Sequence, residues 1–330
     1  MTGDVWLALP PEEIAGLPAG LDYHFYDGGE DGTQPYPADP ARCAFFTVPY
    51  LKRSSVKVGA LPLMPRLEVV QTLTAGVDDV LPAVDALPAG VRLCNARGVH
   101  DASTAELALA LVLAALRGIP DHVRDQDRGH WRPGFRPALA DRSVLIVGYG
   151  SIGAAIEDRL RPFEVGEVTR VARRARLAPH GPVHALADLP ALLPAADVVV
   201  LATPLTDATR HLVDAGFLAR MKDGALLVNI ARGAVVDTGA LLAELTGNPG
   251  RLTAALDVTD PEPLPAGHPL WHSPGVLISP HAGGPSSAFR PRAERLLVEQ
   301  LTRYAAGEPL ANVVRVTGRQ PGAQGASAAH

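Results

Sequence analysis

Cysteine is scarce in this chain: the only two among its 330 residues are Cys43 and Cys94, and they form no CxxC pair. A disulfide framework or a cysteine-based zinc site is therefore not expected. Two isolated thiols are typical of a protein that works in a reducing compartment, so we predict a cytoplasmic location.

The chain also lacks a strong excess of charge of either sign and lacks long apolar runs. The 30 basic and 35 acidic side chains give a net charge of −5, and no basic run interleaved with aromatic residues occurs. Such a sequence lacks the signature of a nucleic-acid-binding protein. The longest apolar stretch, Ala105 to Leu116, is too short to cross a bilayer. Residues 1–20 lack the basic start and apolar core of a signal peptide, so we expect no membrane partner.

A histidine-based metal site is not expected either. Two histidine pairs have the spacing of one helical turn, His180 with His184 and His268 with His272. Pro182 would break a helix within the first pair, and the second lies in a stretch rich in proline and glycine without an HExxH pattern.

The chain does contain many short apolar segments separated by turn residues and helical stretches, which predict parallel α/β sheets in two domains. A capping box at Ser103–Glu106 predicts the start of a helix that continues to Leu116, and another helix is expected around Ala288–Ala306. Strands are expected at Val5–Leu9, Ala44–Val48, Leu67–Leu73, Val91–Asn95, Val168–Val171, Asp197–Ala202, Ala225–Ile230, Thr253–Leu256 and Val276–Ile278.

The most informative segment is VLIVGYGSIG, from Val144 to Gly153, in which an apolar run leads into a GxGxxG pattern. Gly148 would permit a sharp turn, Gly150 would let a pyrophosphate approach the backbone, and Gly153 would let a helix pack closely on the strand. The amino end of that helix supplies N–H groups and a positive dipole end for phosphate. We predict a dinucleotide site formed by Gly148, Tyr149, Gly150, Ser151, Ile152 and Gly153.

The end of the next strand decides which dinucleotide such a site prefers. NAD-selective sites place an acidic residue there, about 20 residues after the last glycine, to accept hydrogen bonds from the ribose. Ala172 takes that position here, and Arg173 and Arg174 follow it. A planar guanidinium can bind a 2′-phosphate through two hydrogen bonds. We therefore predict NADP(H) in preference to NAD(H), with NAD(H) as the alternative if these arginines form only a solvated basic turn.

Polar residues also follow the later strands, at the carboxyl ends where ligands bind in open α/β sheets. Arg232 follows VNIA and could clamp a carboxylate. His281 follows VLISP, and Glu262 could hydrogen-bond its imidazole and raise its proton affinity, which suits a general acid. Asp257 could orient a nicotinamide carboxamide. The cofactor-binding prediction also includes Thr203, Pro204, Ile230 and Gly283.

Together these motifs resemble the D-isomer-specific 2-hydroxyacid dehydrogenases, in particular their glyoxylate/hydroxypyruvate reductase branch. The resemblance runs roughly from Leu67 to Val314 and rests, in order, on GYGSIG, ATPLTDATRHLV, VNIARG, ALDVTDPEPLP and SPHAGG. It implies that Arg232 binds the substrate carboxylate and keto oxygen, that His281 donates a proton to that oxygen, and that Glu262 orients the histidine. Backbone N–H groups of the loop that contains Ala75, Gly76 and Val77 are implied to hold the same carboxylate.

The resemblance also implies a fold and an assembly. We expect two Rossmann-like or flavodoxin-like domains with doubly wound parallel sheets and an active site in the interdomain cleft. Residues 1–99 and 286–330 would form the discontinuous substrate-binding domain, and residues 100–285 the dinucleotide-binding domain. A homodimer is implied, with the helix near Ser103–Leu116 at its interface. The expected reaction is hydride transfer from NADP(H) to a small 2-keto acid, which yields the D-2-hydroxy acid.

Two alternatives remain open. Corepressor-like proteins of this fold sense dinucleotides, act through protein partners and keep the same Arg/Glu/His set, and a short NAD-dependent phosphoglycerate dehydrogenase has the same motifs. Glu262 sets aside formate dehydrogenases, which pair their histidine with glutamine, and the lack of lysine in Leu73–Asp79 sets aside phosphite dehydrogenases. Pro285 stands where a small flexible residue is more usual, which leaves the preferred keto acid open.

Overall fold

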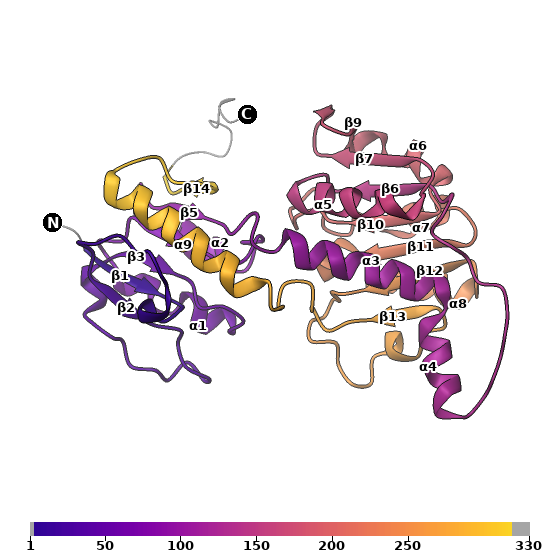
Figure 1. The fold of residues 1–330 in the computed structure, drawn as a ribbon, viewed down its shortest axis with the longest axis horizontal. Coiled ribbons are helices and arrows are strands. Elements are labelled where there is room, and N and C mark those ends of the chain that lie inside the picture. Colours follow the sequence, from indigo (N-terminus) through magenta and orange to yellow (C-terminus); the bar gives the residue numbers. More distant parts are fainter. Residues whose placement is uncertain (1–2, 319–330) are drawn as a thin grey trace. The chain divides into compact units, whose positions relative to one another are not determined.

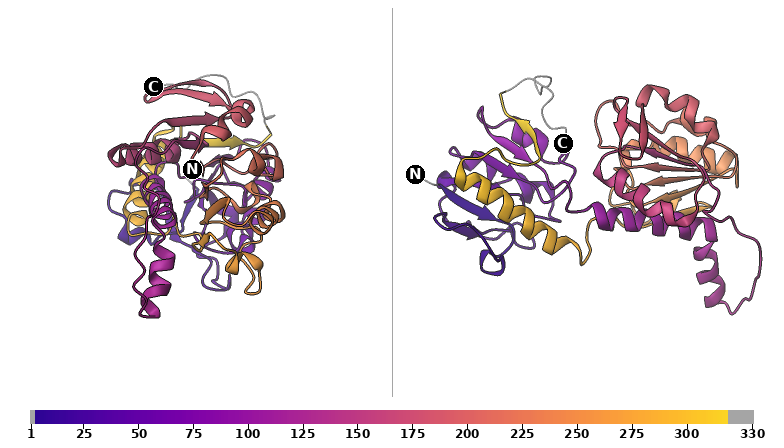
Figure 2. Two further views of the ribbon diagram at one scale, coloured as in Figure 1. Left: turned by 90° about the vertical axis from the view of Figure 1, so that its right-hand side faces the viewer. Right: turned by 45° about the horizontal axis from the view of Figure 1, so that its top comes forward.

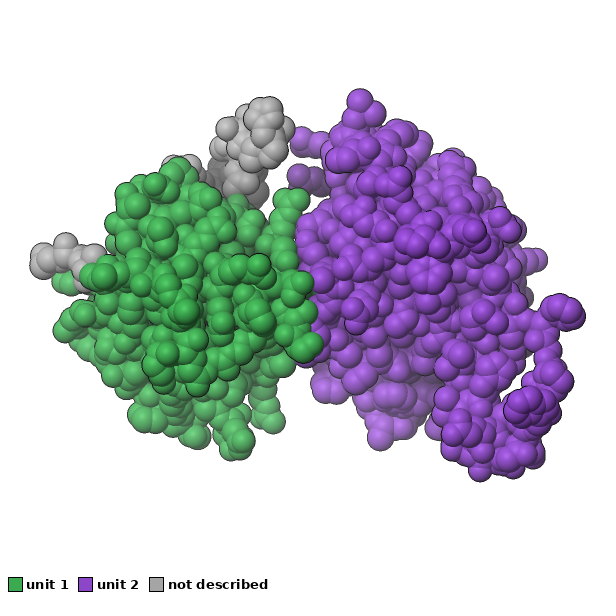
Figure 3. Space-filling view, viewed as in Figure 1, with its two compact units in different colours: residues 1–100, 287–330 green, residues 101–286 purple. Residues whose placement is uncertain are grey.

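The computed structural model describes residues 3–318, and the chain divides into two compact units. Unit 1 combines the chain up to His100 with the segment that begins at Ser287, and unit 2 is Asp101–Ser286 (Figure 3). The chain therefore passes twice between the units, once before the helix α3 (Asp101–Arg117) and once before the helix α9 (Phe289–Ala306). Each unit has its own sheet and its own helices (Figure 1 and Figure 2).

Within residues 3–318, unit 1 contains a six-stranded sheet in the order β14-β5-β4-β3-β1-β2. Its strands are parallel except β14, which runs antiparallel to β5. The large side chains of Trp6, Phe45 and Phe46 are fully buried in its core. The strands are β1 (Asp4–Leu7), β2 (Tyr23–Phe25), β3 (Cys43–Thr47), β4 (Val69–Gln71), β5 (Arg92–Cys94) and β14 (Val313–Val316).

The helices of unit 1 are α1 (Ser54–Val58), α2 (Leu81–Asp85) and α9 (Phe289–Ala306). In α9 the apolar side chains of Ala293, Leu297 and Leu301 recur at a helical spacing and are completely buried. The helix ends at Gly307, whose left-handed φ of 68° lets its N–H bond back to the last turn. Residues far apart in the sequence thus complete one core.

The described part of unit 2 contains an eight-stranded sheet in the order β13-β12-β11-β10-β6-β7-β9-β8, parallel except where β8 pairs with β9. The strand order reverses between β6 and β10, which makes a topological switch point. The strands are β6 (Val144–Val147), β7 (Val168–Ala172), β8 (Arg176–Ala178), β9 (Gly181–Ala185), β10 (Val198–Leu201), β11 (Ala225–Asn229), β12 (Leu252–Leu256) and β13 (Val276–Ile278).

Helices cover both faces of this sheet (Figure 1 and Figure 2). Alternate residues of β6 divide between two cores: Ile146 packs with α3 and α5, and Val147 packs with α7 and α8. A strand buried on both faces has a continuous apolar sequence, which explains VLIV in β6 and VVVL in β10. The helices are α3 (Asp101–Arg117), α4 (Ile119–Asp127), α5 (Ser151–Leu160), α6 (Leu189–Leu192), α7 (Ala215–Arg220) and α8 (Thr238–Gly247).

The predicted fold class, with two doubly wound parallel sheets, is confirmed, and so are all the predicted strands. The predicted capping box is wrong, because α3 already begins at Asp101 and Ser103 lies inside its first turn. An acidic residue in the first turn favours the earlier start. β2, β14 and the β8–β9 hairpin (Arg176–Ala185) were not predicted, since they are short and the hairpin carries Gly181 and Pro182. Among the described residues no single helix is long and apolar enough to span a membrane, although the bent pair α3 and α4 has the length and composition.

Candidate active site

The glycine turn, Gly148–Gly153, links β6 to α5 at the switch point of the unit 2 sheet. Gly148 has a φ of 105°, and a Cβ there would lie 2.4 Å from the backbone of Ala202. A Cβ on Gly153 would lie 2.5 Å from the carbonyl oxygen of Gly148. Two of the three glycines are therefore required by the protein's own backbone, as the sequence predicted.

Gly150 differs from the other two glycines, because a Cβ there would have no described atom within 4 Å. It is the N-cap of α5, and no described side chain caps the helix. The first-turn N–H groups at Ser151, Ile152 and Gly153 have no partner within a helix and lie at its positive dipole end. Open space at Gly150 in front of these donors fits the pyrophosphate of a dinucleotide.

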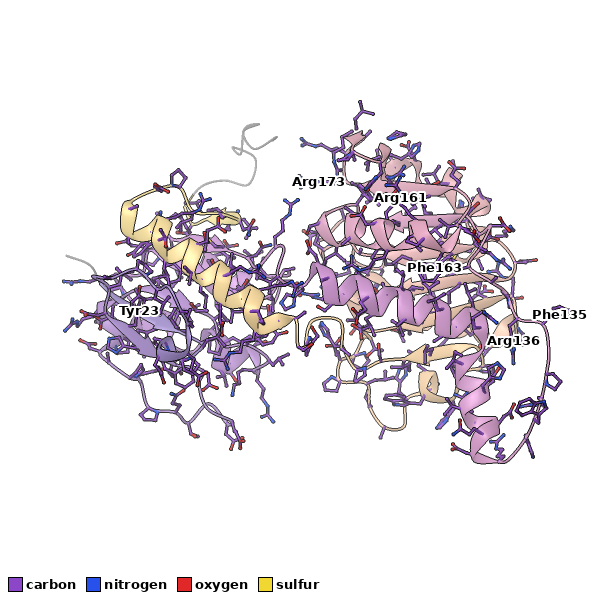
Figure 4. All side chains as sticks on the ribbon, viewed as in Figure 1. Tyr23, Phe135, Arg136, Arg161, Phe163 and Arg173 are labelled. Carbon is purple, nitrogen blue, oxygen red and sulfur yellow. The ribbon has the colours of Figure 1, made fainter. Side chains whose placement is uncertain are left out.

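The end of β7 presents cations without a carboxylate. The strand ends at Ala172, and Arg173 and Arg174 follow it, both exposed (Arg173 is labelled in Figure 4). No described carboxylate pairs with either arginine. Arg176, which the sequence reasoning did not assign, donates a hydrogen bond from Nη2 to the carbonyl oxygen of Tyr149 in the glycine turn. An anion such as a 2′-phosphate fits this group of guanidiniums.

The loop after β13 presents His281. Its Nδ1 lies 2.6 Å from Oε1 of Glu262, and both side chains are about half exposed. The backbone of His281 has a φ of 53°, a left-handed conformation that is uncommon outside glycine and clusters at functional sites. Glu262 lies between two cis peptide bonds to proline, Asp260-Pro261 and Glu262-Pro263. The structure thus brings together the histidine and the carboxylate that the sequence paired.

The charge state of Glu262 follows from its neighbours. Burial alone raises the pKa of this carboxyl, but the hydrogen bond and charge of His281, the Thr259 backbone and the charge of Arg232 outweigh it. The net effect is a pKa below the ordinary value of glutamate. Glu262 is therefore a carboxylate over the whole neutral range and a charged acceptor for Nδ1 of His281.

Arg232 lies just after β11, where Asn229 holds the strand end. The Nδ2 of Asn229 donates to the carbonyl of Arg232 at 3.0 Å, and its Oδ1 accepts from the N–H of Ala231 at 3.0 Å. Asn229 is 1% exposed and is a polar residue in an otherwise apolar buried strand, a signal that the sequence reasoning missed. The half-buried Arg232 also donates from Nη1 to the carbonyl of Ala231 at 2.8 Å.

Asp257, at the end of β12, anchors the whole His281 loop. Its carboxylate accepts from the hydroxyl of Ser279 at 2.6 Å and from the N–H groups of Ala282 and Gly283 at 2.8 and 3.0 Å. Its own carbonyl accepts from the N–H of His281 at 2.7 Å. The side chain is 2% exposed. Three donors leave about one lone-pair direction of the carboxylate for a ligand, so the predicted contact with a carboxamide stays a prediction.

The remaining predicted cofactor residues lie at the same strand ends. Thr203 and Pro204 follow β10, and the carbonyl of Pro204 accepts from the hydroxyl of Thr209 at 2.6 Å. Ile230 follows β11 and is buried. The carbonyl of Gly283 accepts from the hydroxyl of Thr104 in α3 at 3.1 Å. Among the described residues no group of three or more His, Cys, Asp or Glu side chains could hold a metal ion.

In unit 1, the predicted substrate loop has its carbonyls occupied and its N–H groups open. The carbonyl of Thr74 accepts from the hydroxyl of Thr72 at 2.9 Å, and the carbonyl of Gly76 accepts from the hydroxyl of Thr74 at 2.7 Å. The carbonyl of Ala75 accepts from the side-chain amide of Asn95 at 2.8 Å. Within the described chain the N–H groups of Ala75, Gly76 and Val77 donate to no protein acceptor. A row of such donors fits an anion.

Comparison with known proteins bears on the same segments. A family model described as "D-isomer specific 2-hydroxyacid dehydrogenase, NAD binding domain" matches residues 109–283. The human "Glyoxylate reductase/hydroxypyruvate reductase" is 33% identical over 259 residues, which cover 76% of this chain and 77% of that protein. The "Glyoxylate reductase" of Aeropyrum pernix is 34% identical over 270 residues, with 78% and 80% covered.

Among solved structures, one of the most similar is a D-isomer specific 2-hydroxyacid dehydrogenase from Xanthobacter autotrophicus Py2 in complex with NADPH and MES. Its TM-score against this chain is 0.79 at 32% sequence identity, and the match covers 96% of this chain and 98% of that one.

Proposed function

Since this chain belongs to the D-isomer specific 2-hydroxyacid dehydrogenase family and is an NAD(P)-dependent oxidoreductase of its glyoxylate/hydroxypyruvate reductase-like branch, we propose that it reduces a small 2-keto acid to the D-2-hydroxy acid with NADPH as the preferred cofactor. The pair of His281 and Glu262, 2.6 Å apart at the end of a parallel sheet, is the observation that carries the proposal.

The proton comes from His281. Because Nδ1 is held by Glu262, Nε2 is the ring nitrogen left to face a substrate. The carboxylate of Glu262 holds Nδ1 and orients the ring, so that Nε2 can give a proton to the keto oxygen and the ring can regain one from solvent. Asp257 and the backbone bonds of the loop keep the ring in place.

Arg232 stabilises the negative charges of the substrate. A 2-keto acid arrives with a carboxylate, and its keto oxygen becomes negative as the carbon is reduced; bound NADPH supplies the hydride for that carbon. Arg232 can pair with the carboxylate and lower the energy of the growing charge. The open N–H groups of Ala75, Gly76 and Val77 are proposed to hold the carboxylate as well.

The preference for NADPH rests on the end of β7. Ala172 offers no carboxylate to the ribose, and Arg173 and Arg174 are exposed without a described ion-pair partner. A 2′-phosphate would supply the missing negative charge. The NADPH in the Xanthobacter structure agrees with this choice.

A homodimer is also proposed. Beyond α3, the helix α4 and the loop after it carry the exposed apolar side chains of Ile119, Val123, Trp131 and Phe135 (Phe135 is labelled in Figure 4). The side chain of Trp131 is 94% exposed, and a tryptophan contributes its large apolar surface to stability only when that surface is buried. Clustered exposed apolar residues mark association surfaces. Light scattering after gel filtration should give twice the chain mass, and a monomer would contradict this part.

The direct test is the oxidation of NADPH and, in parallel, NADH with glyoxylate, hydroxypyruvate, pyruvate and bulkier 2-keto acids. We expect turnover of at least one small keto acid and a lower KM for NADPH than for NADH. Tight NADPH binding without turnover of any keto acid would overturn the proposed reaction and favour a dinucleotide-sensing binding protein. Formation of the L-hydroxy acid would contradict the assigned stereochemistry.

A further inference from the structure

A buried ion pair lies directly beneath the glycine turn. Glu157, on α5, is 3% exposed, and the guanidinium of Arg170, on β7, binds both of its oxygens. The Nε–Oε2 distance is 2.7 Å, and Nη2 donates to Oε1. The hydroxyl of Tyr149 donates to the same Oε2 at 2.6 Å, and the Arg170 guanidinium lies 5.9 Å from the centre of the Tyr149 ring. We call these three residues the turn triad.

The polar groups of the turn triad are hydrogen-bonded to one another, but removing an ion pair from water costs free energy in a buried core. Burial raises the pKa of Glu157, yet the bonds from Arg170 and Tyr149 outweigh this and keep it below the ordinary value. Burial and the contact with Glu157 raise the pKa of Tyr149 to about 12, so its hydroxyl stays a donor. Neighbouring positions in the same core, such as Ile156 and Leu160, are apolar. Apolar side chains of similar volume often stabilise a core as well as a buried ion pair does, so stability alone does not account for the triad.

The turn triad connects the two ends of the predicted nucleotide site. Tyr149 belongs to the glycine turn, and Arg170 lies two residues before the end of β7. The Arg170 Nη1 also packs against Gly181 at the start of β9, 3.3 Å from where a Cβ would lie. From the other side, Arg176 of β8 donates to the carbonyl of Tyr149. The segment 173–175 between β7 and β8 is here called the arginine link. It is flanked by Arg170, which reaches Tyr149 through Glu157, and by Arg176, which bonds to Tyr149 directly.

We propose that Tyr149, Glu157 and Arg170 are positioning residues that fix the arginine link relative to the glycine turn and thereby set the preference for NADPH over NADH. This inference rests on the proposed function, because it assumes that Arg173 and Arg174 bind the 2′-phosphate. The pyrophosphate binds at the turn in either cofactor, but only NADPH must reach the arginine link at the same time. A shift of the link therefore weakens NADPH binding and leaves NADH binding nearly unchanged.

The test measures the Kd of NADPH and of NADH by fluorescence titration without substrate, together with the thermal midpoint, for wild type, Tyr149→Phe and Glu157→Gln. Tyr149→Phe removes one oxygen and is expected to fold. We expect the Kd ratio of NADH to NADPH to fall a few-fold in Tyr149→Phe and about tenfold in Glu157→Gln, since hydrogen bonds to charged groups are the stronger ones. The Kd of NADH should change less than about twofold in Glu157→Gln, a residue outside the dinucleotide-binding turn.

Glu244→Gln is the matched control. Glu244, on α8, pairs with Arg251 at 2.6 Å, and these side chains are also largely buried. This pair lies on elements that do not form the glycine turn or the arginine link. We expect Glu244→Gln to lower the thermal midpoint as Glu157→Gln does, but to leave the Kd ratio unchanged. Equal loss of NADPH and NADH binding in the triad variants, or an unchanged ratio, would overturn the positioning role.

A double variant, Arg173→Ala with Arg174→Ala, separates this inference from the proposed function. If its Kd ratio falls while the ratios of the triad variants do not, the triad is only structural and the NADPH assignment stands. If the ratio does not change in the arginine double variant, the 2′-phosphate assignment fails and the positioning role fails with it.

Discussion

Two groups of strands in the unit 2 sheet carry different residues at their carboxyl ends. We call the residues after β11, β12 and β13 the proposed catalytic end, and the residues after β6 and β7 the proposed nucleotide end. After β11, β12 and β13 the strand ends carry Arg232, Asp257 and His281, and the buried carboxylate of Asp257 accepts three hydrogen bonds from the His281 loop. After β6 and β7 the strand ends carry glycines and arginines, and no described carboxylate forms an ion pair with Arg173 or Arg174. We propose that the catalytic end holds a proton at a fixed place and that the nucleotide end leaves positive charge open for an anion.

We propose that this difference separates the chemical step from cofactor binding within one sheet. Catalytic groups must be held rigidly, because a small displacement of a reacting group costs much of the rate. A phosphate site needs donors, open space and unpaired cations, which a bare helix terminus and exposed guanidiniums supply. Changes at the catalytic end should therefore alter kcat, and changes at the nucleotide end should alter cofactor affinity.

The largest effect is expected from His281→Ala. Loss of the general acid should lower kcat by about a thousandfold, within the usual range for such groups, because water is a poor substitute as donor. The Kd of NADPH should stay within about twofold, since the nucleotide end is unchanged. Steady-state kinetics and fluorescence titration measure the two quantities, and comparable loss of both would contradict the assigned role of His281.

A smaller loss is expected from Asp257→Asn. An amide in place of the carboxylate would present an NH₂ group to N–H donors at Ala282 or Gly283, so at least one bond that holds the loop would break. We expect kcat to fall about a hundredfold, as for a misplaced catalytic group. If Asp257 also binds the carboxamide, the Kd values of NADPH and NADH should rise together. An unchanged kcat would show that the loop does not depend on this carboxylate.

Sequence reasoning anticipated the contacts around His281 more completely than the contacts around the glycine turn. Arg232, Glu262 and His281 follow strands or prolines and are visible in local patterns, and Glu262 and His281 do meet. The positions that were missed act over long sequence separations: Arg176 returns to Tyr149, and Glu157 pairs with Arg170 on another element. No local periodicity encodes such a pairing. The start of α3 was misjudged because the Ser103–Glu106 pattern resembles a capping box although it lies inside the helix, which begins at Asp101.

Substitutions at two glycines of the turn should affect cofactor binding and protein stability separately. Gly150→Ala adds a methyl group into open space, so the thermal midpoint should hardly change while NADPH binding weakens by about tenfold, as the methyl group occupies the space for phosphate. Gly153→Ala forces a Cβ to 2.5 Å from the Gly148 carbonyl and should cost about 1 to 3 kcal/mol of stability. Calorimetry on both variants checks the contrast, and a large loss of stability in Gly150→Ala would remove it.

The smallest expected effect is a pH dependence at the catalytic end. The folded-state pKa of Glu262 is lowered, so its contribution to stability is fully present above the unfolded-state value of about 4.3 and is lost as the pH falls through the lower folded-state pKa. The effect on stability should be modest, because the pair with His281 is partly exposed. Its effect on rate is larger, since a protonated Glu262 no longer offers Nδ1 of His281 a charged acceptor that orients the ring. The thermal midpoint and kcat/KM of wild type should therefore differ from those of Glu262→Gln near neutral pH, and the two proteins should converge in acid. A constant difference across the acid range would show that the carboxylate of Glu262 does not act through its charge.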